Sequence, residues 1–288
     1  MDIKKYCYDG SKQFTINKVS RSETSLCKKK AEALEKIKKN EKEIVELQEK
    51  LYAEKKEGVI FLFQAMDAAG KDGTINATLS CLSTHGVYEA AFKSPSSVEQ
   101  GHDYLWRVHK ECPAKGEIAI FNRSHYEEVL IYTVKSLFKS QARADRLEEK
   151  DLMPNRYKDI NNFESYLYNN SIRVVKIFLN VSKEEQAKRF LSRIEELEKN
   201  WKCSESDYSE RQYWDAYQEA FENAINETST KIAPWYVVPA DHKWYMRLVV
   251  SEIILATLKK MDPHYPEVSE DRKNTFLEIK AKLEEEIK

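Results

Sequence analysis

The sequence lacks the marks of several classes of protein. Its 288 residues include only five cysteines, with no C-x-x-C pair, so we expect neither a zinc site nor disulfides and take free thiols in a reducing cytoplasm as the default. No run of about 18 apolar residues occurs, and residues 1–14 have no apolar core, so neither a membrane span nor a secretory signal is expected. The motifs H-E-x-x-H, G-x-S-x-G, N-K-x-D and G-x-G-x-x-G are absent, which leaves metalloproteases, α/β-hydrolases, GTPases and dinucleotide-binding proteins without support.

An excess of charge of one sign is missing too. The 47 basic and 48 acidic residues give a net charge of −1, which argues against a general nucleic-acid binder and leaves any anionic ligand to local basic clusters. Charged residues nevertheless make up 33% of the chain and hydrophobic residues 41%, which predicts a real core covered by long solvated helices. The length suits one large α/β domain or two small ones.

Residues 59–74, VIFLFQAMDAAGKDGT, have the layout of a phosphate-binding loop. The apolar run 59–64 is typical of a strand buried on both faces, as in a parallel sheet. The small residues after it let backbone N–H groups surround phosphate oxygens, and Lys71 adds a positive charge before a helix expected over 74–82. The candidate binding residues of this loop are Asp67, Ala68, Ala69, Gly70, Lys71, Asp72, Gly73 and Thr74.

The match to the pattern G-x-x-x-x-G-K-[ST] is incomplete. Ala65 stands in place of the first glycine, and Asp72 in place of the residue that usually binds Mg²⁺. Another group must then hold a metal, and Asp67 inside the loop is the candidate ligand. An ordinary strand–turn–helix junction is the alternative interpretation of the segment taken alone.

Short strands alternate with helices along the chain, which predicts an α/β fold with a parallel sheet. A Lys/Glu-rich helix over 24–56 is expected to lie along the sheet domain, with a dimerising or regulatory helix as the alternative. We expect an N-terminal arm and helix at 1–56, a core at 57–266 with an insertion at about 182–230 that could close over the site, and a C-terminal helix at 267–288. The five strands are predicted at 59–64, 87–93, 117–122, 173–180 and 235–239, and further helices at 96–108, 129–138, 154–168, 182–197, 207–227, 243–258 and 275–288.

Other candidate residues follow the strands or lie on the expected helices. Asn122 and Arg123 come directly after the third strand, where an amide and a guanidinium could hold substrate oxygens, although a surface ion pair is the alternative for Arg123. Arg189 and Arg193 are four residues apart and share a helix face, so they could meet phosphoryl groups or pair with Glu185 and Glu196 on a solvated helix. Lys202 follows a tryptophan that could stack a base or belong to the core, and Asp103 and Arg107 are expected on one helix face.

Six stretches in order resemble the second family of polyphosphate kinases, over roughly residues 51–266. They are MDAAGKDGT at 66–74, HDYLWR at 102–107, FNRSHYEEVL at 121–130, RFLSR at 189–193, KNWK at 199–202 and APWYVVPADHKW at 233–244. The resemblance implies a P-loop kinase fold similar to that of thymidylate kinases: three αβα layers, a five-stranded parallel sheet and a helical lid. Asn122, followed by Ser-His-Tyr-Glu, resembles the subgroup called class III, which is associated with nucleoside mono- and diphosphates as acceptors.

By this resemblance, Asp67 is the Mg²⁺-associated carboxylate, with Mn²⁺ as an alternative ion, and Lys71 is the loop lysine. Arg123 is the arginine after the third strand, and Arg189 and Arg193 are lid arginines that meet the moving phosphoryl group. The candidate substrate-binding residues then also include Asp103, Arg107, Asn122, Glu127 and Lys202.

The implied activity is transfer of a phosphoryl group from inorganic polyphosphate to nucleotides such as AMP, ADP, GMP and GDP. We expect a cytoplasmic enzyme that binds no nucleic acid or membrane and associates as a homodimer or tetramer. Two alternatives stay open from the residues: an ATP-dependent nucleotide kinase of the thymidylate-kinase type, and a regulator that binds nucleotide or polyphosphate without turnover.

Overall fold

Six strands form the central sheet of the computed structural model, which describes residues 2–137, 141 and 143–287. Their order across the sheet is β1-β6-β5-β2-β4-β3, and all neighbours are parallel except β1 and β6. The α/β class and the five parallel strands predicted from the sequence are therefore confirmed. The strands are β1 (Cys7–Tyr8), β2 (Gly58–Ala65), β3 (Val87–Ala91), β4 (Ile118–Asn122), β5 (Ile172–Asn180) and β6 (Trp235–Pro239).

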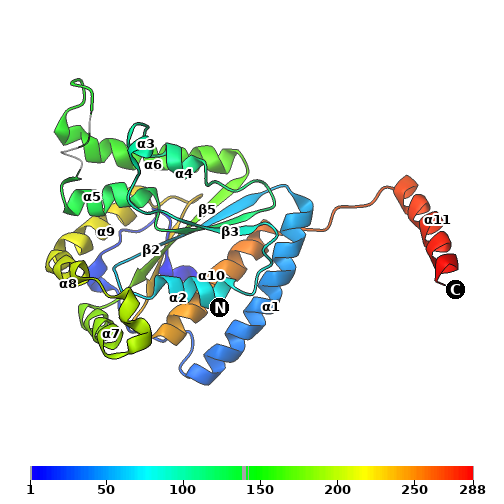
Figure 1. Ribbon diagram of the computed structural model, residues 1–288, viewed down its shortest axis with the longest axis horizontal. Helices are drawn as coiled ribbons and strands as arrows, with labels where there is room; N and C mark the ends of the chain where they lie inside the picture. The colour runs from blue at the N-terminus through cyan, green and yellow to red at the C-terminus, as the bar shows by residue number, and fades with distance from the viewer. Residues whose placement is uncertain (1, 138–140, 142, 288) are drawn as a thin grey trace.

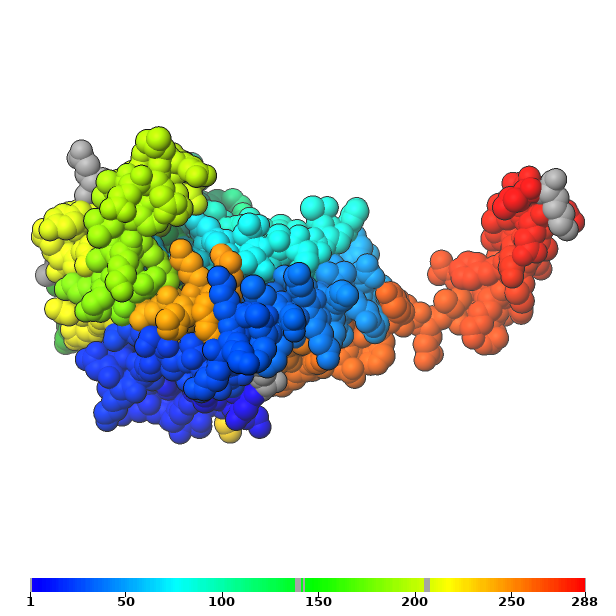
Figure 2. Space-filling model, turned by 90° about the horizontal axis from the view of Figure 1, so that it is seen from below, coloured from blue at the N-terminus to red at the C-terminus, as the bar shows by residue number. Residues whose placement is uncertain are grey.

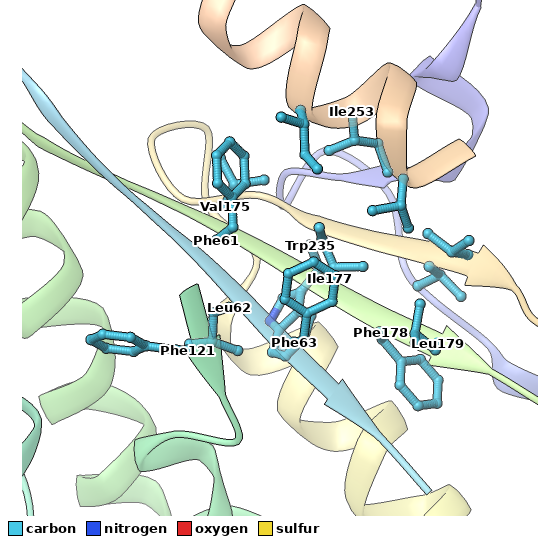
Figure 3. Close-up of a cluster of buried hydrophobic side chains, with 14 of the residues drawn as sticks. Phe61, Leu62, Phe63, Phe121, Val175, Ile177, Phe178, Leu179, Trp235 and Ile253 are labelled. Atoms are coloured by element: carbon cyan, nitrogen blue, oxygen red, sulfur yellow. The ribbon is translucent and has the colours of Figure 1, made fainter. Parts of the chain in front are cut away.

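The core lies on both faces of β2 and β5, the two central strands. Residues from Gly58 to Gln64 of β2 are all buried, as the unbroken apolar run predicts for a strand between two helical layers. Figure 3 shows Phe61 on the side of the sheet where Ile253 of α10 lies, and Phe178 on the opposite side. Phe178 stacks there on Phe221, with ring centroids 4.2 Å apart.

Helices cover both faces of the sheet, giving the three layers (Figure 1). On one face lie α1 (Lys30–Glu54), α2 (Lys71–Leu79) and α10 (Lys243–Met261); on the other lie α6 (Leu152–Asn169) and α9 (Trp214–Thr228). The remaining helices are α3 (Ser97–Gln100), α4 (Trp106–His109), α5 (Ile131–Val134), α7 (Lys183–Glu195), α8 (Glu205–Glu210) and α11 (Glu270–Glu286), with short 3₁₀ helices η1 (Ile3–Tyr6), η2 (Ile16–Lys18), η3 (His125–Val129), η5 (Glu149–Asp151), η6 (Leu197–Lys202) and η7 (Arg211–Tyr213).

Three predictions about local structure are corrected. The N-terminal arm contributes the extra edge strand β1, which is too short to leave a sequence pattern. The single helix expected over 96–108 is two short helices, α3 and α4, because Gly101 ends the first and Asp103 caps the backbone N–H groups of the turn before the second. The helix expected over 129–138 is replaced by η3 and α5, and its last predicted residue lies outside the described part of the chain.

The region expected to form the lid has two structural parts. Residues 183–204 project from the body in Figure 2, where α7 and η6 are coloured lime green. By contrast, α9 buries Trp214, Phe221 and Ile225 against the sheet layer. Any closing motion therefore belongs to the segment before α9, and the lid as a moving element stays a prediction.

The carboxyl ends of the five parallel strands meet at one edge of the sheet. The chain turns there into α2 after β2, into η3 after β4 and into α10 after β6. Ligands of open α/β sheets bind in such a crevice, between strands whose connections leave in opposite directions. Among the described residues, no helix is long and apolar enough to cross a membrane.

Candidate active site

The loop between β2 and α2 is closed by its own backbone. The Ala69 N–H donates to the Met66 carbonyl at 3.1 Å, and Ala68 and Gly70 take left-handed conformations, with φ of 59° and 96°. Gly70 then serves as the N-cap of α2, so the positive end of that helix faces the loop. Ala65 remains the last residue of β2, in an extended position that does not require glycine. The loop can therefore take a phosphate-binding shape despite the missing first glycine.

Four of the predicted side chains meet beside this loop: Asp67, Lys71, Arg123 and Glu127. The Arg123 Nη2 lies 3.6 Å from the Asp67 Oδ1, and both side chains are 47% exposed, so a ligand can reach them. Burial, helped by the charge of Arg123, lowers the pKa of Lys71 to about 8. Burial raises the pKa of Glu127, while Arg123 and Lys71 oppose the rise. Two basic side chains and two carboxyl groups therefore lie close enough together that their charges affect the pKa values of Lys71 and Glu127.

A cavity of about 60 Å³ opens next to this cluster. The charged residues that line it are Asp67, Arg123, Glu127 and Glu210, and apolar residues such as Phe221 line it as well.

Asn122 at the end of β4 joins two carboxylates from neighbouring elements. Its Nδ2 donates to the Asp72 Oδ1 at 3.1 Å and to the Glu89 Oε1 at 2.7 Å. Asp72 and Asn122 were predicted from the sequence; Glu89 was not, because nothing in β3 distinguishes it from an exposed strand residue.

Arg189 reaches the loop, but its guanidinium is occupied. Nη1 donates to the Ala69 carbonyl at 2.5 Å and Nη2 to the Ala240 carbonyl at 2.6 Å, while Nε bonds Glu185 at 2.9 Å. In this arrangement Arg189 ties the loop to the β6–α10 turn and presents no free N–H fork to a phosphoryl group. A direct role in phosphoryl transfer stays a prediction.

The other predicted residues lie away from this cluster. The Arg193 Nη1 contacts the Lys202 carbonyl at 3.5 Å, so both residues lie on the projecting segment. Asp103 caps the turn before α4, and Arg107 bonds the Lys93 carbonyl at 2.7 Å. The two do not share a helix, which corrects that expectation. Of the small loop residues, Thr74 is buried and its hydroxyl donates to the Gly70 carbonyl at 2.8 Å, while Gly73 lies inside α2.

Sequence reasoning missed three polar side chains beside the loop. The Gln186 Nε2 donates to the Asp67 carbonyl at 2.9 Å, which fixes the backbone of the metal-ligand candidate. Lys243 and Arg247 lie one turn apart on α10 and add two basic side chains to this region. Burial and the charges of Arg189 and Lys199 lower the pKa of Lys243. The signal was present in the ADHKW motif, where Lys243 directly follows the β6 turn.

The site has three features: parallel strands, a closed loop followed by a lysine at the start of α2, and a basic cluster at the strand ends. Together they define a kinase of the P-loop class. The family model described as Polyphosphate kinase 2 (PPK2) matches residues 27–266, and the chain belongs to that family. It is thereby a phosphotransferase of the kinase type.

Individual relatives are similar to this chain over most of their length. The chain is 46% identical over 240 residues to the ADP-polyphosphate phosphotransferase of Rhodopseudomonas palustris, covering 83% of each chain. It is 41% identical over 266 residues to the AMP/ADP-polyphosphate phosphotransferase of Meiothermus ruber, covering 92% of this chain and 96% of the relative. The crystal structure of Polyphosphate Kinase 2 from Arthrobacter aurescens TC1 matches with a TM-score of 0.88 and 36% identity, over 97% of this chain and 96% of that chain.

Proposed function

We propose that the protein transfers the terminal phosphoryl group of inorganic polyphosphate to nucleoside mono- and diphosphates, including AMP, ADP, GMP and GDP. The observation that carries this proposal is the loop with its own carboxylate: Asp67 faces Arg123 at 3.6 Å beside the buried Lys71. The names of the relatives from Rhodopseudomonas palustris and Meiothermus ruber support polyphosphate with ADP, or with AMP and ADP.

The donor set of the site fits Mg²⁺, with Mn²⁺ as an alternative. The described residues contain no group of three acidic, histidine or cysteine side chains that could cage a metal. Mg²⁺ does not need one, because it takes one or two carboxylates and fills its other positions with phosphate oxygens and water. The half-exposed Asp67 offers such a carboxylate. Held by Asp67, the ion would supply positive charge that neutralises part of the charge of the phosphates.

The protein's own groups position the reactants and balance charge. Lys71 and Arg123 hold the phosphates from two sides, so that the acceptor oxygen can lie in line with the bond that breaks. That oxygen is already ionised at neutral pH, since the second pKa of a phosphomonoester is about 6. No strong general base is therefore required, and catalysis rests on positioning and electrostatic stabilisation.

A basic surface next to the loop suits a polymeric anion. Lys243 lies within the electrostatic reach of Arg189, Lys199 and Arg247. Arg247 also borders the start of α2, because a Cβ placed on Gly73 would lie 3.6 Å from its Nη2. We infer that successive phosphates of the donor follow this surface, from the loop along α10 toward the projecting segment.

The test is a phosphorus-31 assay with polyphosphate and Mg²⁺ in the absence of ATP, run separately with AMP, ADP, GMP and GDP. The proposal expects loss of the signal of interior polyphosphate, because each transfer shortens the chain and makes the next phosphate terminal, together with formation of the next higher nucleotide. Turnover only when ATP is the donor would replace it by an ATP-dependent nucleotide kinase. Binding of polyphosphate and nucleotide without any product would indicate a regulator.

A further inference from the structure

A cluster of polar side chains is buried in the layer behind Arg123. Tyr126 in η3 donates from its hydroxyl to the Glu164 Oε1 of α6 at 2.8 Å, and the Lys176 Nζ of β5 bonds the Glu164 Oε2 at 2.6 Å. Lys176 also donates to the Thr228 carbonyl of α9 at 2.7 Å. The cluster thus joins the segment after β4 to three separate elements of the core.

The Glu164–Lys176 ion pair is almost completely excluded from solvent. The two side chains are 1% and 0% exposed, respectively. Burial opposes ionisation of Glu164, but Lys176 and His125 outweigh it, so the pKa of Glu164 lies below its usual range. A buried pair of this kind gives little net stability compared with an apolar pair of similar volume, because both ions lose their hydration.

The cluster is linked to the backbone of Arg123 through two residues. Ser124 accepts hydrogen bonds at its Oγ from the Tyr126 N–H and from the Gln64 Nε2 of β2, both at 3.1 Å. Arg123 itself has a φ of 67°, a left-handed conformation that a residue with a side chain adopts only under constraint. Its N–H donates to the Phe63 carbonyl at 3.3 Å, so residues 123–126 are held from β2 on one side and from the buried cluster on the other.

We propose that Tyr126, Glu164 and Lys176 are positioning residues that hold Arg123 in its left-handed conformation and direct its guanidinium toward Asp67. The hydroxyl of Tyr126 transmits the constraint, because it is the only polar atom of that buried side chain and bonds the ion pair directly. The ring packs edge-on against Trp235, with centroids 4.8 Å apart, so loss of the hydroxyl leaves the apolar packing in place. This inference rests on the proposed function only for its kinetic consequence, not for its structural one.

The structural consequence is tested with Tyr126→Phe and a matched control. Asn40→Ala removes a buried bond of a different interface, where Asn40 of α1 donates to Ser251 of α10 at 3.0 Å. Amide hydrogen exchange of a peptide covering 121–130 should become at least several-fold faster in Tyr126→Phe and stay at the wild-type rate in Asn40→Ala. Equal exchange in Tyr126→Phe and the wild type would overturn the positioning role, whether or not the protein uses polyphosphate.

The kinetic consequence is tested by a double-mutant cycle with Arg123→Ala. Tyr126→Phe should lower kcat on the order of ten- to a hundredfold, as a misplaced catalytic group does, with little change in KM. In the Arg123→Ala background the same substitution should have no further effect, because the group that it positions is gone. Equal effects in both backgrounds would show that Tyr126 acts independently of Arg123 and would remove the proposal. A wild-type protein without polyphosphate turnover would instead contradict the proposed function, and hydrogen exchange would still decide the positioning role.

The ion pair gives a second, independent variant. Replacing both members, Glu164→Leu with Lys176→Met, removes the charges together and avoids leaving one of them unpaired in the core. We expect a folded protein with an intact unfolding transition and the same loss of kcat as Tyr126→Phe, since the hydroxyl has lost its acceptor. Wild-type kcat in this double variant would contradict the proposal.

Discussion

Lys71 carries the positive charge of the candidate phosphate-binding loop, and its surroundings decide at which pH that charge is present. An exposed lysine titrates near pH 10.4. Burial and the neighbouring Arg123 lower the pKa of Lys71 to about 8, although Glu127, Asp72 and Asp67 oppose the shift. The protonated amine is thus less favoured in the free protein than in an exposed lysine. A bound anion favours the protonated form, because it attracts the positive charge.

This titration predicts an alkaline limb in the pH profile. kcat/KM for polyphosphate should fall as the pH rises through about 8, because the neutral amine of the free protein attracts phosphate less. The limb for kcat should lie at higher pH, since bound phosphate raises the pKa of Lys71. Lys71→Arg, which stays protonated, should lose the limb near pH 8 while keeping part of the activity. An unchanged limb in Lys71→Arg would assign it to another group.

Asp67 is the residue whose charge matters most in the proposed reaction. Asp67→Asn keeps the shape of the side chain but removes the carboxylate that faces Arg123 and would ligate Mg²⁺. We expect kcat to fall on the order of 10²–10³ or more, with an unchanged thermal midpoint because the side chain is half exposed. Initial rates over a range of Mg²⁺ concentrations and a thermal melt measure the two effects. Turnover near that of the wild type would disprove the assignment.

At the scale of the element, the loop between β2 and α2 depends on one glycine more than on the other. Gly70 has a φ of 96°, and a Cβ there would lie 3.4 Å from the Met246 Cε and 3.5 Å from the Arg189 Nη1. Gly73 lies inside α2, where a Cβ would meet only the Arg247 Nη2 at 3.6 Å. Replacement of glycine by alanine should therefore change the stability of the fold in opposite directions at the two positions.

Gly70→Ala should destabilise the fold by about 1 kcal/mol or more, because alanine is strained in the left-handed region. Gly73→Ala should stabilise it by about 0.5–1 kcal/mol, since alanine loses less conformational freedom than glycine in a helix. Urea unfolding of the two variants and the wild type measures both changes. A stabilised Gly70→Ala would mean that the loop has another conformation.

The sequence revealed elements wherever one local pattern decides the structure. The buried strands β2 and β4 are nearly continuous apolar runs, and β5 is apolar except for Arg173, Lys176 and Asn180. Ser182 caps α7, as its side chain accepts from the Glu185 N–H at 3.1 Å. Two-residue β1 and the break between α3 and α4 depend on tertiary pairing and on a turn, which periodicity does not record.

Side-chain partners were harder to predict than elements. The spacing of Arg189 and Arg193 correctly places both on α7, but only the folded chain brings the Ala69 and Ala240 carbonyls to the Arg189 guanidinium. Likewise, Glu164 and Lys176 were unremarkable in a helix and a strand, because nothing local shows that both face the same dry layer. Contacts between distant segments decide these roles.

At the scale of the whole molecule, the last helix stands apart from the rest. Figure 1 shows α11 at the end of an extended segment, away from both helical layers. None of its residues is buried, and Phe276, Leu277 and Leu283 are 47%, 64% and 50% exposed. Because α11 buries no residue against the body, it contributes little to the stability of the body. Association as a dimer or tetramer stays a prediction.

Removal of residues 269–288 tests this view of the molecule. The truncated chain keeps the segment in which Pro263 is buried and the Tyr265 hydroxyl bonds Glu49 at 3.4 Å. We expect its thermal midpoint to stay within about 2 °C of that of the full chain, which corresponds to less than roughly 1 kcal/mol for a domain of this size. Sedimentation of both chains at several concentrations shows whether the mass per particle changes with it. A midpoint lower by more than about 5 °C would mean that α11 covers apolar surface in solution, and a simultaneous drop in mass would place that surface on another copy of the chain.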